Sequence, residues 1–282
     1  MNIIMIVFLL CPLPLFAQES DSTDFSSVKE LLKKDQLEEV VVKKQKKEKK
    51  KKEQNIEKER KLYEIPDTQE MLSFFSEMWL VKNQTVLKWD FKRPDYGLED
   101  YFKKFLENMG QYEKSFKILV LNSPVTPHMA LPAGKNEYIF LLSLPLMRTL
   151  DLSKQEISIL LYEDMKRIEL GRFSGAVIPR KLKNMTKKDF YKNKKIDKKI
   201  IKKILKNYDE FVFNQGYDFQ SQYIVTKTID QQFKSDRELW NSYYQLKRKF
   251  DKLLKSNVLY QNYSKLYPSP ELQINWLTPK KD

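Results

Sequence analysis

Apolar residues recur at helical spacing in the part of the chain that follows residue 63, beginning with two predicted helix faces. The first face comprises Met71, Phe74, Phe75, Met78 and Trp79. The second comprises Tyr101, Phe102, Phe105, Leu106 and Met109. Asp67 stands where a helix N-cap is expected before the first face, and Gly110 stands where the second helix should end.

Short apolar runs between the helical segments predict a small sheet. Residues 116–121 and 138–141 are rich in branched and aromatic side chains, which favour strands, and residues 132–136 predict a turn before the second strand. Ser153 and Glu156 have the spacing of a capping box at a helix start. Further helices are expected over residues 144–150, 153–171, 197–213 and 219–250, with an irregular segment from Tyr267 onward. These elements predict an α+β domain with more helix than strand.

The first 62 residues differ in composition from the rest of the chain. Residues 1–17 are almost wholly apolar and end at Ala17 before a polar stretch, a pattern typical of a secretory signal peptide. Residues 18–62 are dominated by polar and charged residues, so we expect a flexible Lys-rich linker. The folded domain is then expected over residues 63–282, and the whole chain carries a net charge of +14.

Cys11 is the only cysteine and lies inside this leader. A lipoprotein signal prefers a small residue before the cysteine, but Leu10 is large, so lipidation at Cys11 is disfavoured. Cleavage after Ala17 would leave a mature chain without a thiol. Neither a disulfide nor a cysteine metal site is then available.

One apolar island interrupts the linker, at residues 37–42. It contains Leu37 followed, after two Glu, by Val40, Val41 and Val42. Consecutive Val residues favour an extended strand, and the island resembles a stretch near the N-terminus of SusC-type TonB-dependent outer-membrane receptors. The simpler interpretation is a chance β-prone patch, and the functional alternative is a short strand that binds a partner by adding to an edge strand of its sheet.

The segment 160–173 has the pattern of a zinc-peptidase active-site helix without its metal ligands. Such a helix needs two His residues four positions apart, with a Glu beside the first as general base. The corresponding positions hold Glu163, Asp164 and Arg167. His128 is the only histidine of the chain, so a His-pair zinc site cannot form.

The elements around this helix occur in the order found in a known family. A Pro-containing segment (126–134) precedes the strand 138–141, the helix 144–150 and the lead-in 152–157, and the helix 160–173 follows without a gap. In this order and in the motif Ile-Glu-Leu-Gly, the chain resembles the zinc metallopeptidases of the HtpX and BepA type. The resemblance implies a zincin-like fold, in which a small sheet packs against an active-site helix and a second, ligand-bearing helix.

The resemblance also assigns a position to each polar residue. Glu163 falls on the first His position, Asp164 on the catalytic Glu position and Arg167 on the second His position. Arg172 falls on a third His position, and Asp218 on the position of the family's Glu ligand. Each departs from the family's pattern, so catalysis does not carry over and no cofactor is expected. We expect instead that Arg167 hydrogen-bonds Glu163, Asp218 or both in a partly buried cluster.

A basic segment follows the candidate helix. Residues 180–206 contain thirteen Lys or Arg and two Asp. The Ile and Leu residues between 196 and 205 predict an amphipathic helix that docks by its apolar face and exposes Lys198, Lys199, Lys202 and Lys203. Contact with anionic lipid or an acidic protein is the functional alternative, and export argues against nucleic acid. His128 is expected in a loop, without a metal or catalytic role.

These observations predict a catalytically inactive peptidase homologue that acts as a protein-binding or scaffold subunit. Its expected location is the periplasm, at an outer-membrane complex, with an envelope protein as partner. One alternative is an active metallohydrolase with a carboxylate-only metal site formed by Glu163, Asp164 and Asp218. Another is a basic protein that binds membrane surfaces.

Overall fold

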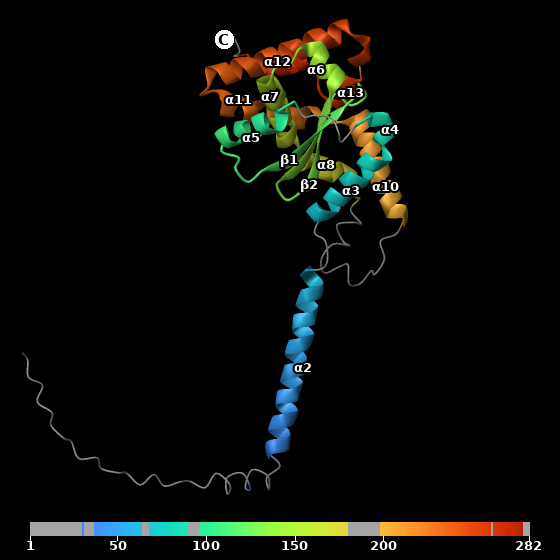
Figure 1. Ribbon diagram of the computed structural model, residues 1–282, viewed down its shortest axis with the longest axis vertical. Coiled ribbons are helices and arrows are strands. Elements are labelled where there is room, and N and C mark those ends of the chain that lie inside the picture. Colours follow the sequence, from blue (N-terminus) through green and yellow to red (C-terminus); the bar gives the residue numbers. More distant parts are fainter. Residues whose placement is uncertain are drawn as a thin grey trace, which may run out of the picture. The chain divides into compact units, whose positions relative to one another are not determined.

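The protein is described by a computed structural model, which covers residues 30, 37–63, 68–89, 96–179, 198–260 and 262–278 (Figure 1). Several features of the sequence analysis lie outside these residues: the expected signal peptide 1–17 with Cys11, the expected N-cap Asp67, and residues 180–197 of the basic segment. The chain divides into two units, Met1–Lys61 and Leu62–Asp282. Among the described residues, no helix is both long enough and apolar enough to cross a membrane.

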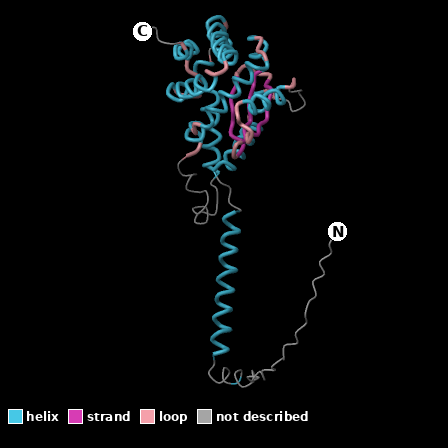
Figure 2. The backbone as a smooth tube through the Cα atoms, turned by 90° about the vertical axis from the view of Figure 1, so that its left-hand side faces the viewer, coloured by secondary structure: helices cyan, strands magenta, loops and turns pink. Residues whose placement is uncertain are grey.

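The second unit is an α+β domain, as predicted, with many helices and one three-stranded sheet (Figure 2). Its elements in chain order are α3 (Thr68–Lys82), α4 (Gln84–Leu87), α5 (Leu98–Asn108), β1 (Ser115–Leu121), β2 (His128–Gly134), β3 (Glu137–Ser143), α6 (Leu144–Leu150), α7 (Lys154–Glu169), α8 (Arg172–Val177), α10 (Lys198–Glu210), the π-helix η2 (Phe211–Gln215), α11 (Phe219–Phe233), α12 (Arg237–Ser256), the 3₁₀ helix η3 (Val258–Tyr260), α13 (Tyr263–Leu266) and α14 (Pro270–Leu277).

The sheet has the order β1-β3-β2, with β1 parallel and β2 antiparallel to β3. The strand β2 was missed by the sequence prediction, which placed His128 in a loop and residues 132–136 in a turn. Pro132 has no backbone N–H to donate to a neighbouring strand. It is compatible with β2 because this strand lies at an edge of the sheet, where one side of the strand has no neighbour. The helix α3 covers this edge, and the Ser76 hydroxyl donates to the Pro132 carbonyl at 2.7 Å.

The helix α7 lies at the centre of the domain, where it packs against β2, α5, α11 and α12 (Figure 1). It begins with the predicted capping box: the Ser153 hydroxyl accepts from the Glu156 N–H, and the Glu156 carboxylate accepts from the Ser153 N–H. Most of its residues are buried, including polar ones. A helix enclosed on nearly all sides must place its polar groups against partners inside the protein.

Two predicted segments of the C-terminal half differ from the structure. The helix expected over 219–250 is two helices, because Asp236 acts as the N-cap of α12 and accepts from the N–H groups of Glu238 and Leu239. The segment after Tyr267 is not irregular but forms α14. Its Ser269 N-cap and Pro270 at the first turn are typical helix-start residues that the sequence prediction did not use.

The first unit contains α2 (Leu37–Tyr63) up to its last two residues, and this helix corrects the expectation of an extended strand over residues 37–42. Those residues form the start of α2. The rest of α2 is dominated by Lys, Glu and Gln, which are good helix formers that can extend a helix into a Val-rich segment. Local β propensity is therefore overridden by the neighbouring sequence.

Candidate functional site

The candidate site is a cluster of charged side chains enclosed around α7. Glu163, Asp164 and Arg167 each have 0% of their surface exposed. Burial of a charged group is costly unless the group is paired and hydrogen-bonded. The contacts of each therefore determine what the site can do.

Arg167 links the two carboxylates of its own helix to α11. Its Nη2 lies 2.9 Å from Glu163 Oε1, and its Nη1 pairs with Asp164 Oδ1. The Nη2 contact has ion-pair distance without hydrogen-bond alignment. Arg167 Nε donates to Gln222 Oε1 at 2.9 Å. Burial acts to lower the pKa of Arg167, but Glu163 and Asp164 outweigh it, so the pKa is raised and the cation is fixed.

The guanidinium of Arg167 is also covered by aromatic rings. Its carbon lies 4.5 Å from the ring centroid of Tyr267 and 5.7 Å from that of Tyr217. A cation over a desolvated ring gains electrostatic attraction to the ring face. The rings thus fill the space beside Arg167 with apolar surface that still favours its charge.

Glu163 is held by a second cation from α12. Lys247 Nζ lies 2.7 Å from Glu163 Oε1 and 2.6 Å from Oε2, while Gln222 Nε2 donates to Oε1 at 2.7 Å. Burial alone would raise the pKa of Glu163, but Arg167 and Lys247 lower it to about 2. Burial lowers the pKa of Lys247 to about 8 despite the attraction of Glu163.

Asp164 pairs with the single histidine of the chain. His128 Nδ1 lies 2.8 Å from Asp164 Oδ2, and both side chains are fully buried. The imidazole stacks on Tyr267 with ring centroids 4.5 Å apart, and the Tyr267 hydroxyl donates to the His128 carbonyl at 2.7 Å. The expectation of a loop histidine is therefore wrong, because His128 begins β2 and contributes to the cluster.

The cluster is completed by neutral amides. Gln222 Nε2 lies 3.1 Å from Gln273 Oε1, and the Gln273 amide donates to the Pro268 carbonyl at 2.8 Å. Thr226, one turn after Gln222 on α11, lies 3.2 Å from the same nitrogen. Five elements that are distant in sequence, β2, α7, α11, α12 and α14, thus meet in one polar network.

Asp218 does not belong to this network, which corrects the position assigned to it. It is the N-cap of α11, where its Oδ1 accepts from the Ser221 N–H at 2.7 Å. The side chains of Asp218 and Arg172 are about half exposed and lie 4.0 Å apart. The Ser221 N–H lowers the pKa of Asp218. Gln222, one turn further along α11, takes the place predicted for Asp218. Arg167 does pair with Glu163, but as an ion pair and not through the hydrogen bond that was expected.

The carboxylate-only metal site proposed as an alternative is not assembled in this arrangement. Its third member, Asp218, lies outside the cluster, and each oxygen of Glu163 and Asp164 already faces Arg167, Lys247 or His128. Within the described part of the chain, no three His, Cys, Asp or Glu residues are arranged to hold a metal ion. The oxygens of both carboxylates are thus engaged by nitrogen atoms of the protein.

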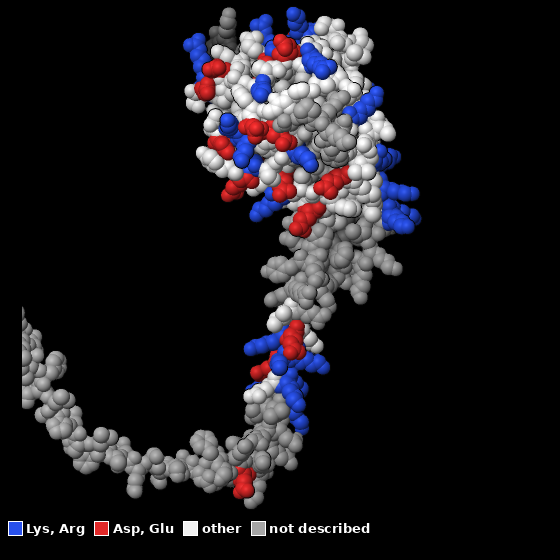
Figure 3. Space-filling model, viewed as in Figure 1, with Lys and Arg blue, Asp and Glu red and all other residues white. Residues whose placement is uncertain are grey.

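The predicted binding residues lie elsewhere. Lys198, Lys199, Lys202 and Lys203 are exposed on α10, whereas Ile204 and Tyr208 are buried, so the predicted amphipathic helix docks by its apolar face. Figure 3 shows Lys and Arg side chains gathered along α10. Leu37, Val40, Val41 and Val42 begin α2, and their side chains lie outside the described positions.

Comparisons of the chain with protein-family models, with curated proteins and with solved structures found no match.

Proposed function

We propose that this chain is a catalytically inactive, peptidase-like protein that acts by binding another protein as a scaffold subunit. The observation that carries the proposal is the complete burial of Glu163, Asp164 and Arg167. Two carboxylates face two cations, Arg167 and Lys247, within one closed network. Charges neutralised in this way stabilise a particular packing of helices rather than a reacting substrate.

The proposed zincin-like fold is supported by the arrangement around α7. The hairpin β2–β3 precedes α6 and α7 in the expected order, and α11 meets the polar face of α7 through Gln222. In an active member of the resembled family, metal ligands would come from these two helices. Here the positions on α7 carry an ion-pair cluster, and a neutral amide comes from α11.

General acid–base chemistry by the His128–Asp164 pair is not supported by the geometry. A general base must come within hydrogen-bonding reach of the proton that it abstracts, directly or through one water. Both side chains are enclosed, and Tyr267 stacks on the imidazole. The pair is better explained as part of the structural network that joins β2 to α7.

The proposed location is the periplasm, at an outer-membrane complex with an envelope protein as partner. It rests on the leader-like composition of residues 1–17 and on the family resemblance. A second candidate function, contact with anionic lipid, is favoured by the exposed Lys row on α10.

The proposal is tested on the full-length chain in its native envelope. Cross-linking followed by affinity purification should recover one partner in a fixed ratio, and the mature chain should begin at Gln18. Lys166→Ala is the control, because it changes a residue of α7 outside the cluster, and it should recover the partner in the same ratio as the wild type. The purified chain should not hydrolyse unfolded casein. Casein hydrolysis that is abolished by Glu163→Ala would show that the protein is an enzyme.

A further inference from the structure

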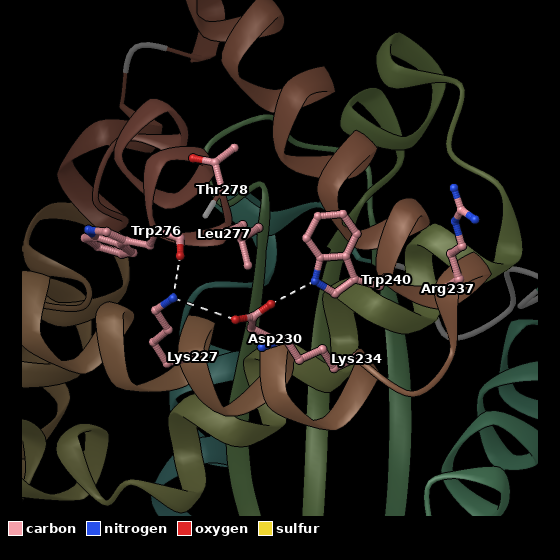
Figure 4. Close-up of a pocket in the computed structure, with 8 residues that line it drawn as sticks. All are labelled: Lys227, Asp230, Lys234, Arg237, Trp240, Trp276, Leu277 and Thr278. Carbon is pink, nitrogen blue, oxygen red and sulfur yellow. Dashed lines mark hydrogen bonds and ion pairs between the residues drawn. The ribbon is translucent and has the colours of Figure 1, made fainter. Parts of the chain in front are cut away.

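The C-terminal helices line an open cavity of about 460 Å³ that has no part in the ion-pair cluster. Its lining comes from α11, the start of α12 and the end of α14, as Figure 4 shows. The lining residues are Lys227, Asp230, Lys234, Arg237, Trp240, Trp276, Leu277 and Thr278. Cavities of roughly 300–1,000 Å³ are typical of small-molecule sites.

Two walls of this cavity are fixed by one residue pair on α11. Lys227 Nζ donates to the Trp276 carbonyl at 2.5 Å and lies 3.7 Å from Asp230 Oδ2. Asp230, which is 8% exposed, accepts from the Trp240 indole N–H at 2.8 Å. The pair therefore holds the end of α14 and the start of α12 on either side of the cavity (Figure 4). Binding to such a preformed site costs less free energy, because fewer side chains must become ordered when the ligand binds.

The charge of the lining is unbalanced. The charge of Asp230 is offset by Lys227, which leaves the cations Lys234 and Arg237 at the exposed side. Among the described residues neither of these two forms an ion pair. The acidic neighbours Asp236 and Glu238 do not line the cavity, and Asp236 is used as the N-cap of α12. The lining thus favours an anion.

The remaining surface is apolar and aromatic. Leu277 is a buried residue of the lining, and the indole of Trp240 stacks on Tyr244 with ring planes 7° apart. On the other side, Trp276 packs against Phe219 and Tyr223. A ligand that contacts both the cations and the apolar surface of the lining has an apolar or aromatic body next to a negative group. A carboxylate matches the bidentate geometry of Arg237.

We propose that this cavity binds an apolar or aromatic group bearing a free carboxylate. Two sources carry that chemistry: a small organic acid, and the C-terminal residue of a polypeptide. The inference does not depend on the inactive-peptidase proposal, because Asp230 and Gln222 are eight residues apart on α11, or about 12 Å along the helix. If the polypeptide source is correct, the cavity supplies a recognition site for the partner.

The test titrates the full-length chain while recording tryptophan fluorescence. The probes are phenylacetate, decanoate, and a hexapeptide ending in Phe with either a free or an amidated C-terminus. Trp79 and Trp89 are buried in the core, so a ligand-dependent change that disappears in Trp240→Phe reports the cavity. We expect saturable binding of at least one carboxylate. Preference for the free peptide would identify a polypeptide end, and preference for the small acids an organic acid.

Two double variants each remove two cations. One pair lines the cavity, and the other lies on α12 away from it. Lys234→Ala with Arg237→Ala should weaken binding about tenfold or more, as expected for the loss of charge-assisted hydrogen bonds. Arg248→Ala with Lys252→Ala makes the same charge change on α12 away from the cavity and should leave the affinity unchanged. The proposal is overturned if the amidated peptide gives saturable binding with the same affinity as the free peptide. It is also overturned if both pairs of substitutions have equal effects, or if none of the carboxylates saturates at millimolar concentration.

Discussion

The helices α7 and α10 both carry many charged residues, but they use them in opposite ways. On α7, Glu163, Asp164 and Arg167 are fully enclosed and paired with each other and with side chains from other elements. On α10, the Lys side chains at 202 and 203 face solvent while Ile204 faces the core. Charge density alone therefore does not distinguish a structural centre from a solvated surface.

The difference has an energetic consequence. A buried ion pair contributes little net stability relative to apolar packing, yet removal of one partner leaves an uncompensated charge and is strongly destabilising. An exposed Lys contributes almost nothing when it is removed. Substitutions on the two helices should thus differ by several kcal/mol in their effect on the free energy of unfolding.

The largest effect is expected for Arg167→Ala. This change removes the cation that faces Glu163 and Asp164 and the donor to Gln222. Loss of one partner in a buried pair costs roughly 3–5 kcal/mol, so we expect a loss of at least this size in chemical denaturation. Arg172→Ala is the control, because Arg172 is half exposed near Asp218 and should cost about 0–1 kcal/mol. Equal effects of the two substitutions would contradict a buried cluster.

A second prediction concerns acid stability. The pKa of Glu163 is lowered to about 2 from an ordinary value of 4.5, so the unfolded state binds the proton more readily. The stabilisation that results is fully present above pH 4.5 and is lost as the pH falls from 4.5 to 2. Its size is up to about 3 kcal/mol, since each pKa unit corresponds to about 1.4 kcal/mol.

The acid limb of the stability curve should therefore be shallower in Glu163→Gln than in the wild type. Glu77→Gln is the matched control, because it makes the same chemical change at an exposed side chain of α3 outside the cluster. Denaturation midpoints measured between pH 2 and 5 distinguish the variants. If Glu163→Gln and the wild type lose stability in parallel over this range, Glu163 is not held ionised by Arg167 and Lys247.

A third prediction tests the coupling between α7 and α12. Lys247→Met leaves Glu163 with one cation fewer, and Glu163→Gln leaves Lys247 buried without its carboxylate. The double variant should be less destabilised than the sum of the single variants. The coupling should lie within about 0.5–3 kcal/mol, the range for residues in direct contact. Additive effects in the double-mutant cycle would show that the contact does not contribute to stability.

The smallest effect is expected on α10. Lys202→Gln with Lys203→Gln should change the free energy of unfolding by less than about 0.5 kcal/mol, because both side chains are exposed. The same variant should bind anionic liposomes less tightly at low salt only if α10 contacts lipid. Unchanged, salt-independent liposome binding would remove the membrane-surface alternative.

Local sequence signals were sufficient for much of the scaffold but not for the contacts of the site. The capping box of Ser153 and Glu156 set the start of α7, and apolar spacing located α3 and α5. The strand β2 was missed because Pro132 and Gly134 interrupt an otherwise buried run that shows no alternation. Ser269 and Pro270 did signal α14, so that helix could have been found.

The partners of Arg167 show where sequence reasoning stops. Glu163 is four residues away on one helix, so helical periodicity alone predicts the pair. Gln222 and Lys247 approach from other helices, and no residue pattern near them indicates that they are buried. Asp218 was chosen because it is acidic, but it is used at the surface as an N-cap. Long-range packing decides which turn of α11 faces α7, and a single sequence does not contain that register.

The most direct test of the proposal that the ion-paired site is inactive is the metal content of the purified full-length chain after incubation with zinc and gel filtration. We predict less than stoichiometric zinc, and a melting temperature that EDTA does not change, because Arg167 and Lys247 occupy the carboxylates that a metal would need. One tightly held zinc per chain, lost in Glu163→Ala, would contradict the account and identify a functional metal centre.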